Sequence, residues 1–165
     1  MENWDAYDVN GNRLDLTLVR GEMIPEGVYH AVVIVIVVHK DGDFLLMQRS
    51  MDKVEYPGYY EPGASGSVLQ FETPLKAAFR ELEEETGILA TNMYFIEKTA
   101  KIEYKTIYSI YYTVYSGDKN AIQLQEHETM NYKWIDENQF ILSMDEEWLL
   151  VMFKDAVRFV ISKMK

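Results

Sequence analysis

The longest run of apolar positions in the chain covers residues 29–39 and consists almost entirely of β-branched side chains. This run predicts a strand that is buried on both faces of a sheet, because β-branched residues suit a pleated backbone and leave no polar face for solvent. A polar turn at residues 40–43 leads into a second predicted strand at residues 44–49. Near the N-terminus, the Asn10-Gly11 pair favours the positive φ angles of a tight hairpin.

A helix is predicted over residues 74–86 by its two ends and by its period. Thr73 is a suitable N-cap, Pro74 fits the first helical position, and Gly87 supplies the left-handed residue that ends many helices. Apolar residues recur at i, i+3, i+4 and i+7 and predict one buried face, made of Leu75, Ala78, Phe79 and Leu82.

The second half of the chain mixes further strands with a helix. Strands are predicted at residues 93–104, 106–115 and 132–135, the second of them dense in tyrosine and isoleucine. Ser143, with Glu146 three residues later, has the pattern of a capping box and predicts a final amphipathic helix that reaches about residue 162. Strands mixed with helices, without a regular βαβ rhythm, favour an α+β fold in which helices sandwich a mixed sheet.

Length and composition narrow the class of protein. The 165 residues are enough for one domain, so we expect a single domain over 1–165, with residues 1–28 as an N-terminal hairpin packed on it. A net charge of −11 disfavours binding to nucleic acid or to anionic membranes. The chain has no cysteine, which excludes disulfides and cysteine nucleophiles, and no apolar run approaches the ~20 residues of a membrane helix. The acidic N-terminus is unlike a signal peptide, and a cytoplasmic protein is expected.

Four acidic residues crowd the second half of the predicted helix, between Arg80 and Glu85. At 100° per residue, Glu81, Glu84 and Glu85 fall within about 100° of arc, off the predicted apolar face. Acids near a helix C-terminus oppose the macrodipole, and the Glu81/Glu85 pair adds repulsion of roughly 0.2 to 0.5 kcal/mol. A solvated acidic face is the simplest interpretation, but local rules are often broken at functional sites.

The spacing around these acids resembles the signature of the Nudix hydrolases. Five residues separate Gly66 from Glu72, and seven more separate Glu72 from Arg80; the pattern is completed, without a departure, by Glu81, Leu82, Glu84, Glu85, Gly87 and Ile88. The resemblance implies an α/β/α sandwich around a mixed β-sheet. It also implies metal-dependent hydrolysis of a diphosphate bond in a nucleoside diphosphate derivative or a related diphosphate.

By position, the resemblance implies a Mg²⁺ or Mn²⁺ site whose ligands are Glu81, Glu84, Glu85 and the carbonyl of Ser65. A hard cation prefers such oxygen ligands, and it would offset the repulsion between the acids and an anionic substrate. In the same resemblance, Glu81 and Arg80 belong to the catalytic set, and structural loop roles fall to Gly66, Glu72 and Gly87. Glu128, from a loop opposite the helix, is a candidate general base or extra metal ligand, and Glu126 is nearly as eligible.

Outside the signature, the resemblance extends over residues 5–140 to the Nudix branch that includes isopentenyl diphosphate isomerase. Arg49 and Lys53 match positions that contact the diphosphate there; the alternative is an ordinary exposed pair at a strand end. The isomerase needs a cysteine at the position of Ser65 and a metal-binding histidine at that of Ser67, so a hydrolase is favoured over an isomerase.

A third candidate is a non-catalytic Nudix sensor that binds a nucleotide, and it is disfavoured because such modules usually lose the glutamates that this chain keeps. The expected partner is a small diphosphate whose identity the motifs leave open, and a homodimer is the favoured assembly. Of the three histidines, only His30 matches a metal ligand of the isomerase; all three are interpreted as strand-end or surface residues.

Overall fold

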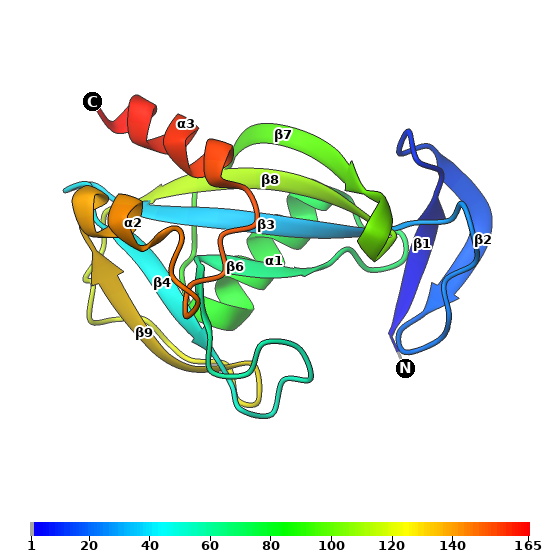
Figure 1. The fold of residues 1–165 in the computed structure, drawn as a ribbon, viewed down its shortest axis with the longest axis horizontal. Helices are drawn as coiled ribbons and strands as arrows, with labels where there is room; N and C mark the ends of the chain where they lie inside the picture. The colour runs from blue at the N-terminus through cyan, green and yellow to red at the C-terminus, as the bar shows by residue number, and fades with distance from the viewer. Residues whose placement is uncertain (1) are drawn as a thin grey trace.

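The computed structural model describes residues 2–165, so Met1 of the predicted N-terminal extension lies outside it. Two strands, β1 (Asn3–Tyr7) and β2 (Arg13–Val19), form a hairpin that stands at one end of the molecule (Figure 1). The Asn-Gly turn joins them, as predicted. The hairpin is tied to the main body by two backbone hydrogen bonds of 2.9 Å between Tyr7 and Tyr29.

The main body is built on a seven-stranded sheet. Its central strand, β3 (His30–His39), pairs in parallel with β8 (Thr106–Tyr115) and antiparallel with β6 (Ala64–Ser67). The other strands are β4 (Phe44–Arg49), β5 (Tyr60–Pro62), β7 (Tyr94–Lys101) and β9 (Thr129–Ile135). All remaining pairs are antiparallel, so the sheet is mixed, as predicted.

The sheet divides where β4 separates from β3. β4 pairs with β3 only between Phe44 and Val38, and it then pairs with β5 on one side and β9 on the other, while β6 takes its place beside β3. The chain crosses from β5 to β6 at Gly63, which has φ of +65°. A β-carbon at Gly63 would lie 1.8 Å from the Val35 carbonyl oxygen, so only glycine fits this step. The crossing brings residues 61 and 65 to the two sides of the division.

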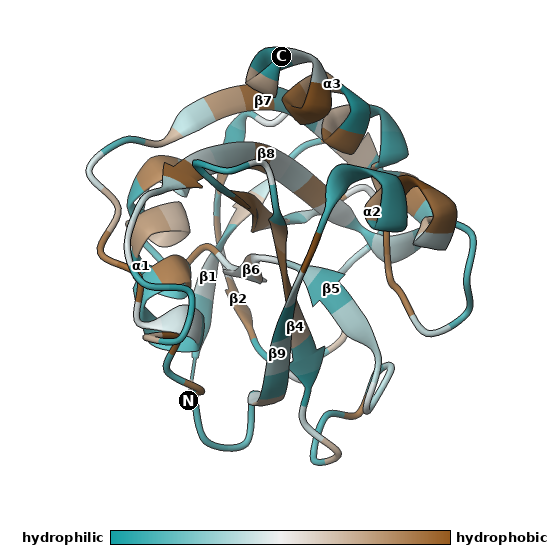
Figure 2. Ribbon diagram, turned by 90° about the vertical axis from the view of Figure 1, so that its left-hand side faces the viewer, coloured by the Kyte–Doolittle hydropathy of each residue, from teal (hydrophilic) through white to brown (hydrophobic). Residues whose placement is uncertain are grey.

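Helices cover both faces of the sheet (Figure 2). Helix α1 (Pro74–Thr86) packs on one face, against a core that includes Val33, Val35 and Leu45. The other face packs against α2 (Glu137–Ser143) and α3 (Lys154–Met164), with Phe140 and Val160 fully buried. The architecture is therefore α+β, a helix layer on each side of a mixed sheet. None of the helices within residues 2–165 has the length and apolar character needed to cross a membrane.

The predicted helix over residues 74–86 is confirmed, but its buried face differs from the prediction. Thr73 caps the N-terminus by accepting a hydrogen bond from the Lys76 N–H, and Gly87 ends the helix with φ of +72°. Leu75 is 45% exposed, whereas the buried residues are Ala77, Ala78, Leu82, Glu85 and Thr86. The helix face that packs on the sheet is thus centred between Ala78 and Glu85. The prediction from the apolar period placed this face elsewhere on the helix, because that period takes only apolar residues as buried and so left Glu85 out.

The prediction of one helix from Ser143 to about residue 162 was wrong. Ser143 is the last residue of α2, whose capping box is formed by Asp136 and Gln139, and α3 begins only at Lys154. The segment between them runs along β5, where Tyr60 donates to the Trp148 carbonyl at 2.8 Å and accepts from the Leu150 N–H at 2.7 Å. These tertiary hydrogen bonds replace the helical ones.

The strand predicted at residues 93–104 also ends earlier. β7 stops at Lys101, and a 3-10 turn (Ile102–Tyr104) leads through Lys105, at φ of +48°, into β8.

Candidate functional site

The backbone of β6 turns two of its residues toward α1. Val68 donates its N–H to the Ala31 carbonyl, and in an antiparallel pair the residues that bond the neighbouring strand alternate with residues that face away from it. Ser65 and Ser67 are therefore the residues whose backbone groups point away from β3. The Ser65 N–H donates to Glu85 Oε2 at 3.1 Å, so the Ser65 carbonyl, on the same side, also faces the carboxylates of α1.

Gly66 is in contact with the carboxylate of Glu81. A β-carbon on Gly66 would lie 2.0 Å from the Glu81 carboxylate carbon and 2.1 Å from one of its oxygens. The close approach of strand and helix at this point therefore requires the absence of a side chain.

Arg80 ties the loop after β6 to the helix. Its Nε and one terminal nitrogen donate to the two oxygens of Glu72 at 2.9 and 2.8 Å, and that same nitrogen also donates to the Ser67 carbonyl at 3.0 Å. The other terminal nitrogen donates to Glu81 at 2.7 Å and to Glu84 at 3.3 Å. Glu72 in turn accepts from the Leu69 N–H at 3.0 Å, so Arg80 and Glu72 fix the loop against the helix.

The three acids of the helix lie in different environments. Glu85 is 5% exposed, Glu81 lies partly buried between Gly66 and Arg80, and the side chain of Glu84 is 43% exposed on the outer side of Arg80. The structure therefore brings Glu85 to the Ser65 backbone and Glu81 to Gly66, but leaves Glu84 at the rim. Gly87 lies at the helix end, where its N–H donates to the Glu83 carbonyl at 2.8 Å.

Without a cation, the ionised forms of the two buried acids are disfavoured. Burial raises the pKa of Glu81 to about 7, although the neighbouring Arg80 guanidinium opposes the shift. Burial, and then the negative charges of Glu61 and Glu81, raise the pKa of Glu85 well above its usual range. A cation among these oxygens would remove both costs, and a donor set made only of oxygen atoms fits a hard divalent ion.

The acids do not form a ready cage by themselves. Among residues 2–165, no group of three or more acidic or histidine side chains is arranged to hold a metal ion as it stands. The physical reason is visible in the hydrogen bonds, since Glu81 and Glu84 turn to Arg80, and Glu85 turns to the Ser65 N–H. Carboxylates that face one another without a cation repel, and each of these three accepts a hydrogen bond from a nearby N–H group instead.

The structure adds one acid that the sequence prediction missed. Glu61, on β5, accepts a hydrogen bond from Arg49 at 2.9 Å through one oxygen and from the Ser65 hydroxyl at 3.2 Å through the other. It lies across the division of the sheet, next to the loop glycines. The available signal was its position just before the Pro62-Gly63 pair that opens this loop.

Arg49 and Lys53 both lie beside the site. The Arg49 Nε donates to the Glu55 carbonyl at 3.1 Å, and its guanidinium is held by Glu61. Lys53 forms an ion pair with Glu128, and its charge acts to lower the pKa of Glu85. The side chain of Glu126 is 90% exposed to solvent, whereas that of Glu128 is 32% exposed. The two loop glutamates therefore differ in burial.

The histidines lie outside this group of residues. His30 stacks on Trp4, with ring centroids 4.6 Å apart, and its Nε2 lies 2.8 Å from the Thr106 hydroxyl. His39 ends β3 and binds the Gly117 carbonyl at 3.1 Å, and His127 pairs with Asp52 on the surface.

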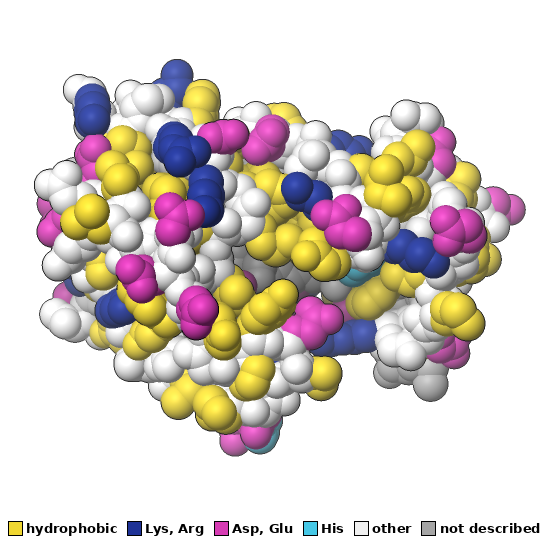
Figure 3. All heavy atoms as spheres, viewed as in Figure 1, with side chains coloured by type: hydrophobic (Ala, Val, Ile, Leu, Met, Phe, Trp, Pro, Cys, Tyr) yellow, Lys and Arg dark blue, Asp and Glu magenta, His cyan; other side chains and the backbone are white. Residues whose placement is uncertain are grey.

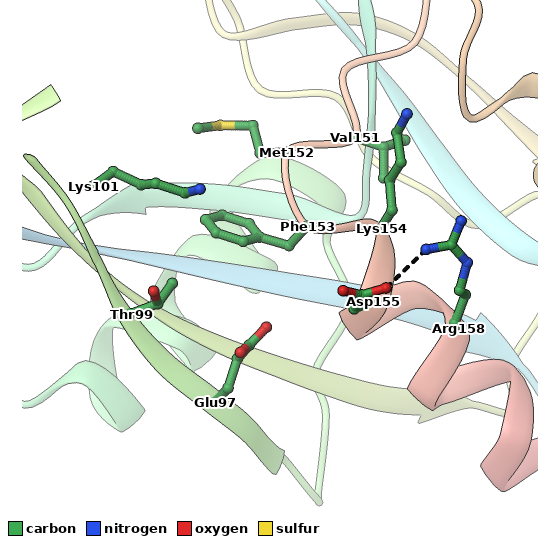
Figure 4. Close-up of a pocket in the computed structure, with 9 residues that line it drawn as sticks. All are labelled: Glu97, Thr99, Lys101, Val151, Met152, Phe153, Lys154, Asp155 and Arg158. Atoms are coloured by element: carbon green, nitrogen blue, oxygen red, sulfur yellow. Dashed lines mark hydrogen bonds and ion pairs between the residues drawn. The ribbon is translucent and has the colours of Figure 1, made fainter. Parts of the chain in front are cut away.

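The surface of the molecule is hollowed in more than one place. The face in Figure 3 is hollowed between the N-terminal hairpin and the C-terminal part, over the region where β3 and β6 run in Figure 1. A separate pocket of about 450 Å³ lies between β7 and the start of α3, with Lys101, Phe153 and Arg158 among its lining residues (Figure 4). None of the acids, arginines or glycines of the candidate site lines this pocket. Its Arg158 forms an ion pair with Asp155.

Comparison with known proteins identifies relatives in sequence and in fold. The family model described as NUDIX domain matches residues 28–155. A Nudix hydrolase of Listeria monocytogenes is 38% identical over 89 residues, which are 54% of this chain and 53% of that protein. The chain thus spans about half the length of the curated relatives it matches.

Solved structures share the fold along most of the chain. DR0079 of Deinococcus radiodurans has a TM-score of 0.76 at 14% identity, and the match covers 99% of both chains. A MutT protein of Methanosarcina mazei Go1 has a TM-score of 0.63 at 26% identity, over 83% of this chain and 96% of that one. The α/β/α arrangement expected from the sequence is therefore the fold of this chain.

Proposed function

The chain belongs to the NUDIX domain family, and on that premise we propose that it is a metal-dependent hydrolase of diphosphate bonds. Its substrate class is a nucleoside diphosphate derivative or a related diphosphate. The observation that carries the proposal is that two acids of α1 lie against neighbouring residues of β6: Glu85 accepts from the Ser65 N–H, and Glu81 occupies the space that Gly66 leaves open.

In this proposal the divalent ion, Mg²⁺ or Mn²⁺, is held by Glu81, Glu85 and the Ser65 carbonyl, with Glu84 at the outer edge. When bound, such an ion activates water and stabilises the charge on the attacking and leaving oxygens. The chain's own residues then have separate tasks. Arg80 orients Glu81 through a 2.7 Å hydrogen bond, and Glu72 holds Arg80 in place.

Arg49 and Lys53 are proposed to bind the diphosphate. Both lie beside the acids. The Glu55 carbonyl holds the Arg49 Nε at 3.1 Å, and the planar guanidinium suits phosphate oxygens. Glu128 is the proposed general base, because it forms an ion pair with Lys53 beside the site, whereas the Glu126 side chain lies in solvent.

Two alternatives are less well supported. Residues outside the signature resemble the branch that includes isopentenyl diphosphate isomerase, but isomerase chemistry needs a cysteine at the position of Ser65. A nucleotide sensor would not need Glu81 and Glu85 buried at a cost in free energy, nor a glycine at position 66 that makes room for Glu81. The proposed setting is a cytoplasmic homodimer acting on a small molecule, in keeping with the acidic charge and the lack of cysteine.

The test is a hydrolysis screen over a panel of diphosphates, with released phosphate or AMP-type product as the readout. Activity is expected with Mg²⁺ or Mn²⁺, and it should disappear after exhaustive chelation and return when the ion is restored. Glu85→Gln is the inactive control. Hydrolysis that survives chelation, or a panel without turnover in the presence of both ions, would reject the proposal.

A further inference from the structure

A carboxylate outside the Nudix signature lies against the proposed metal centre. Glu61 comes from β5, on the far side of the division of the sheet, and both members of its pair with Arg49 are largely buried, with 17% and 15% of the side chains exposed. It is held only by the Arg49 guanidinium and the Ser65 hydroxyl among the described residues. A paired carboxylate in so enclosed a position is unusual at a sheet edge.

Ser65 connects this acid to the helix. Its hydroxyl donates to Glu61 Oε2 at 3.2 Å, and its N–H donates to Glu85 Oε2 at 3.1 Å. One residue therefore has a carboxylate on each side. The charge of Glu61 also acts on Glu85 more strongly than that of Glu81 does. Glu61 and Glu85 therefore interact electrostatically, and both bind Ser65.

We propose that Glu61 is an additional carboxylate ligand of the metal centre, supplied by β5, and that Arg49 holds it until the divalent ion binds. The inference rests on the proposed function. Glu61 has a better partner once the ion is present, since a carboxylate suits a hard cation, and Arg49 has one once the diphosphate is present, since a guanidinium suits phosphate oxygens. The exchange leaves no charge unpaired: Arg49 moves to the diphosphate, and Glu61 moves to the ion.

The alternative role for Glu61 is to position Arg49 only. The two roles differ in what they predict for ion binding without substrate. A ligand contributes to Mn²⁺ affinity directly, whereas a positioning residue affects diphosphate binding and leaves Mn²⁺ affinity unchanged. Arg49→Gln separates them further, because it frees a ligand and removes a positive charge near the ion.

The experiment measures Mn²⁺ binding to the full chain by electron paramagnetic resonance of the free ion, without substrate. Glu61→Gln should weaken binding by roughly 100-fold or more, because loss of a group that only orients a metal ligand already costs about 10- to 100-fold. Arg49→Gln should bind Mn²⁺ at least as tightly as the parent. Glu83→Gln is the matched control, because it makes the same charge change on α1, where no hydrogen bond or ion pair between residues 2 and 165 involves its carboxylate. It should stay within about twofold of the parent.

Each other outcome has a defined meaning. If Glu61→Gln binds Mn²⁺ like the parent while Glu85→Gln does not, Glu61 is no ligand, and the inference fails while the proposed function stands. If Arg49→Gln weakens Mn²⁺ binding as much as Glu61→Gln, the pair is a structural unit and the inference also fails; this arm leaves the carboxylate intact and decides the matter even if Glu61→Gln does not fold. If the parent itself binds no Mn²⁺, the proposed function fails first.

Discussion

Gly66→Ala should separate the stability of the fold from the function of the site. The added β-carbon would lie 2.0 Å from the Glu81 carboxylate carbon, and ordinary contact begins at 3.4 Å, so that carboxylate must move by about 1.4 Å. The clash falls on the end of a flexible side chain, and Gly66 is outside the set of residues with positive φ, so the backbone tolerates alanine. A displacement of about 1 Å at a catalytic group can cost about 10²-fold in rate, or about 2.7 kcal/mol of transition-state stabilisation.

The expected result is a folded Gly66→Ala protein with a melting temperature near that of the parent, weaker Mn²⁺ binding and kcat/KM lower by about 10²-fold or more. The measurements are thermal unfolding, Mn²⁺ titration and hydrolysis of the best substrate found in the panel. The control is a double-mutant cycle with Glu81→Ala. With the carboxylate removed, adding Gly66→Ala should reduce Mn²⁺ affinity no further, because the clash no longer exists. Parental turnover in Gly66→Ala, or a full additional loss in the Glu81→Ala background, would refute the reasoning.

Three further predictions follow from the same structure. Glu85→Gln should lower kcat by roughly 10³-fold because it removes a buried ligand charge. Glu84→Gln should lower kcat less, because Glu84 lies at the half-exposed rim. Equal losses of kcat in steady-state kinetics would place Glu84 in the inner site. Burial lowers the pKa of His30 to about 4, while the unfolded chain takes up the proton near pH 6.5, so this residue's contribution is intact above pH 6.5 and up to about 3 kcal/mol is lost as the pH falls to 4. Urea unfolding at pH 7.5 and 4.5 should show a smaller difference for His30→Gln than for the parent, and an equal difference would contradict the assignment. Neither the parent nor Ser65→Cys should exchange solvent deuterium into isopentenyl diphosphate. The reason is that Ser65 and Ser67 occupy the positions at which the isomerase needs its cysteine and histidine. Measurable exchange by mass spectrometry would restore the isomerase alternative.

The elements whose signals are local could be predicted from the sequence. The cap at Thr73, the proline after it and the stop at Gly87 fixed the bounds of α1, and the β-branched run marked the central strand of the sheet. These signals depend on backbone conformation within a few residues, so they can be identified without knowledge of distant contacts. The spacing from Gly66 to Glu85 likewise indicated the family, because it records which residues one strand and one helix must bring together.

Only the tertiary structure decided which face of α1 is buried, where the last helix begins and which acids meet. The apolar period could not predict that Glu85 points into the core, since its burial depends on the Ser65 N–H twenty residues earlier. Ser143 has a good cap pattern, but hydrogen bonds from Tyr60 to the following segment outweigh it. Glu61 reaches the site because the sheet divides at β4 and the chain crosses the division at Gly63. That contact depends on strand pairing across the whole domain, and pairing between distant segments leaves no periodic trace in the sequence around Glu61.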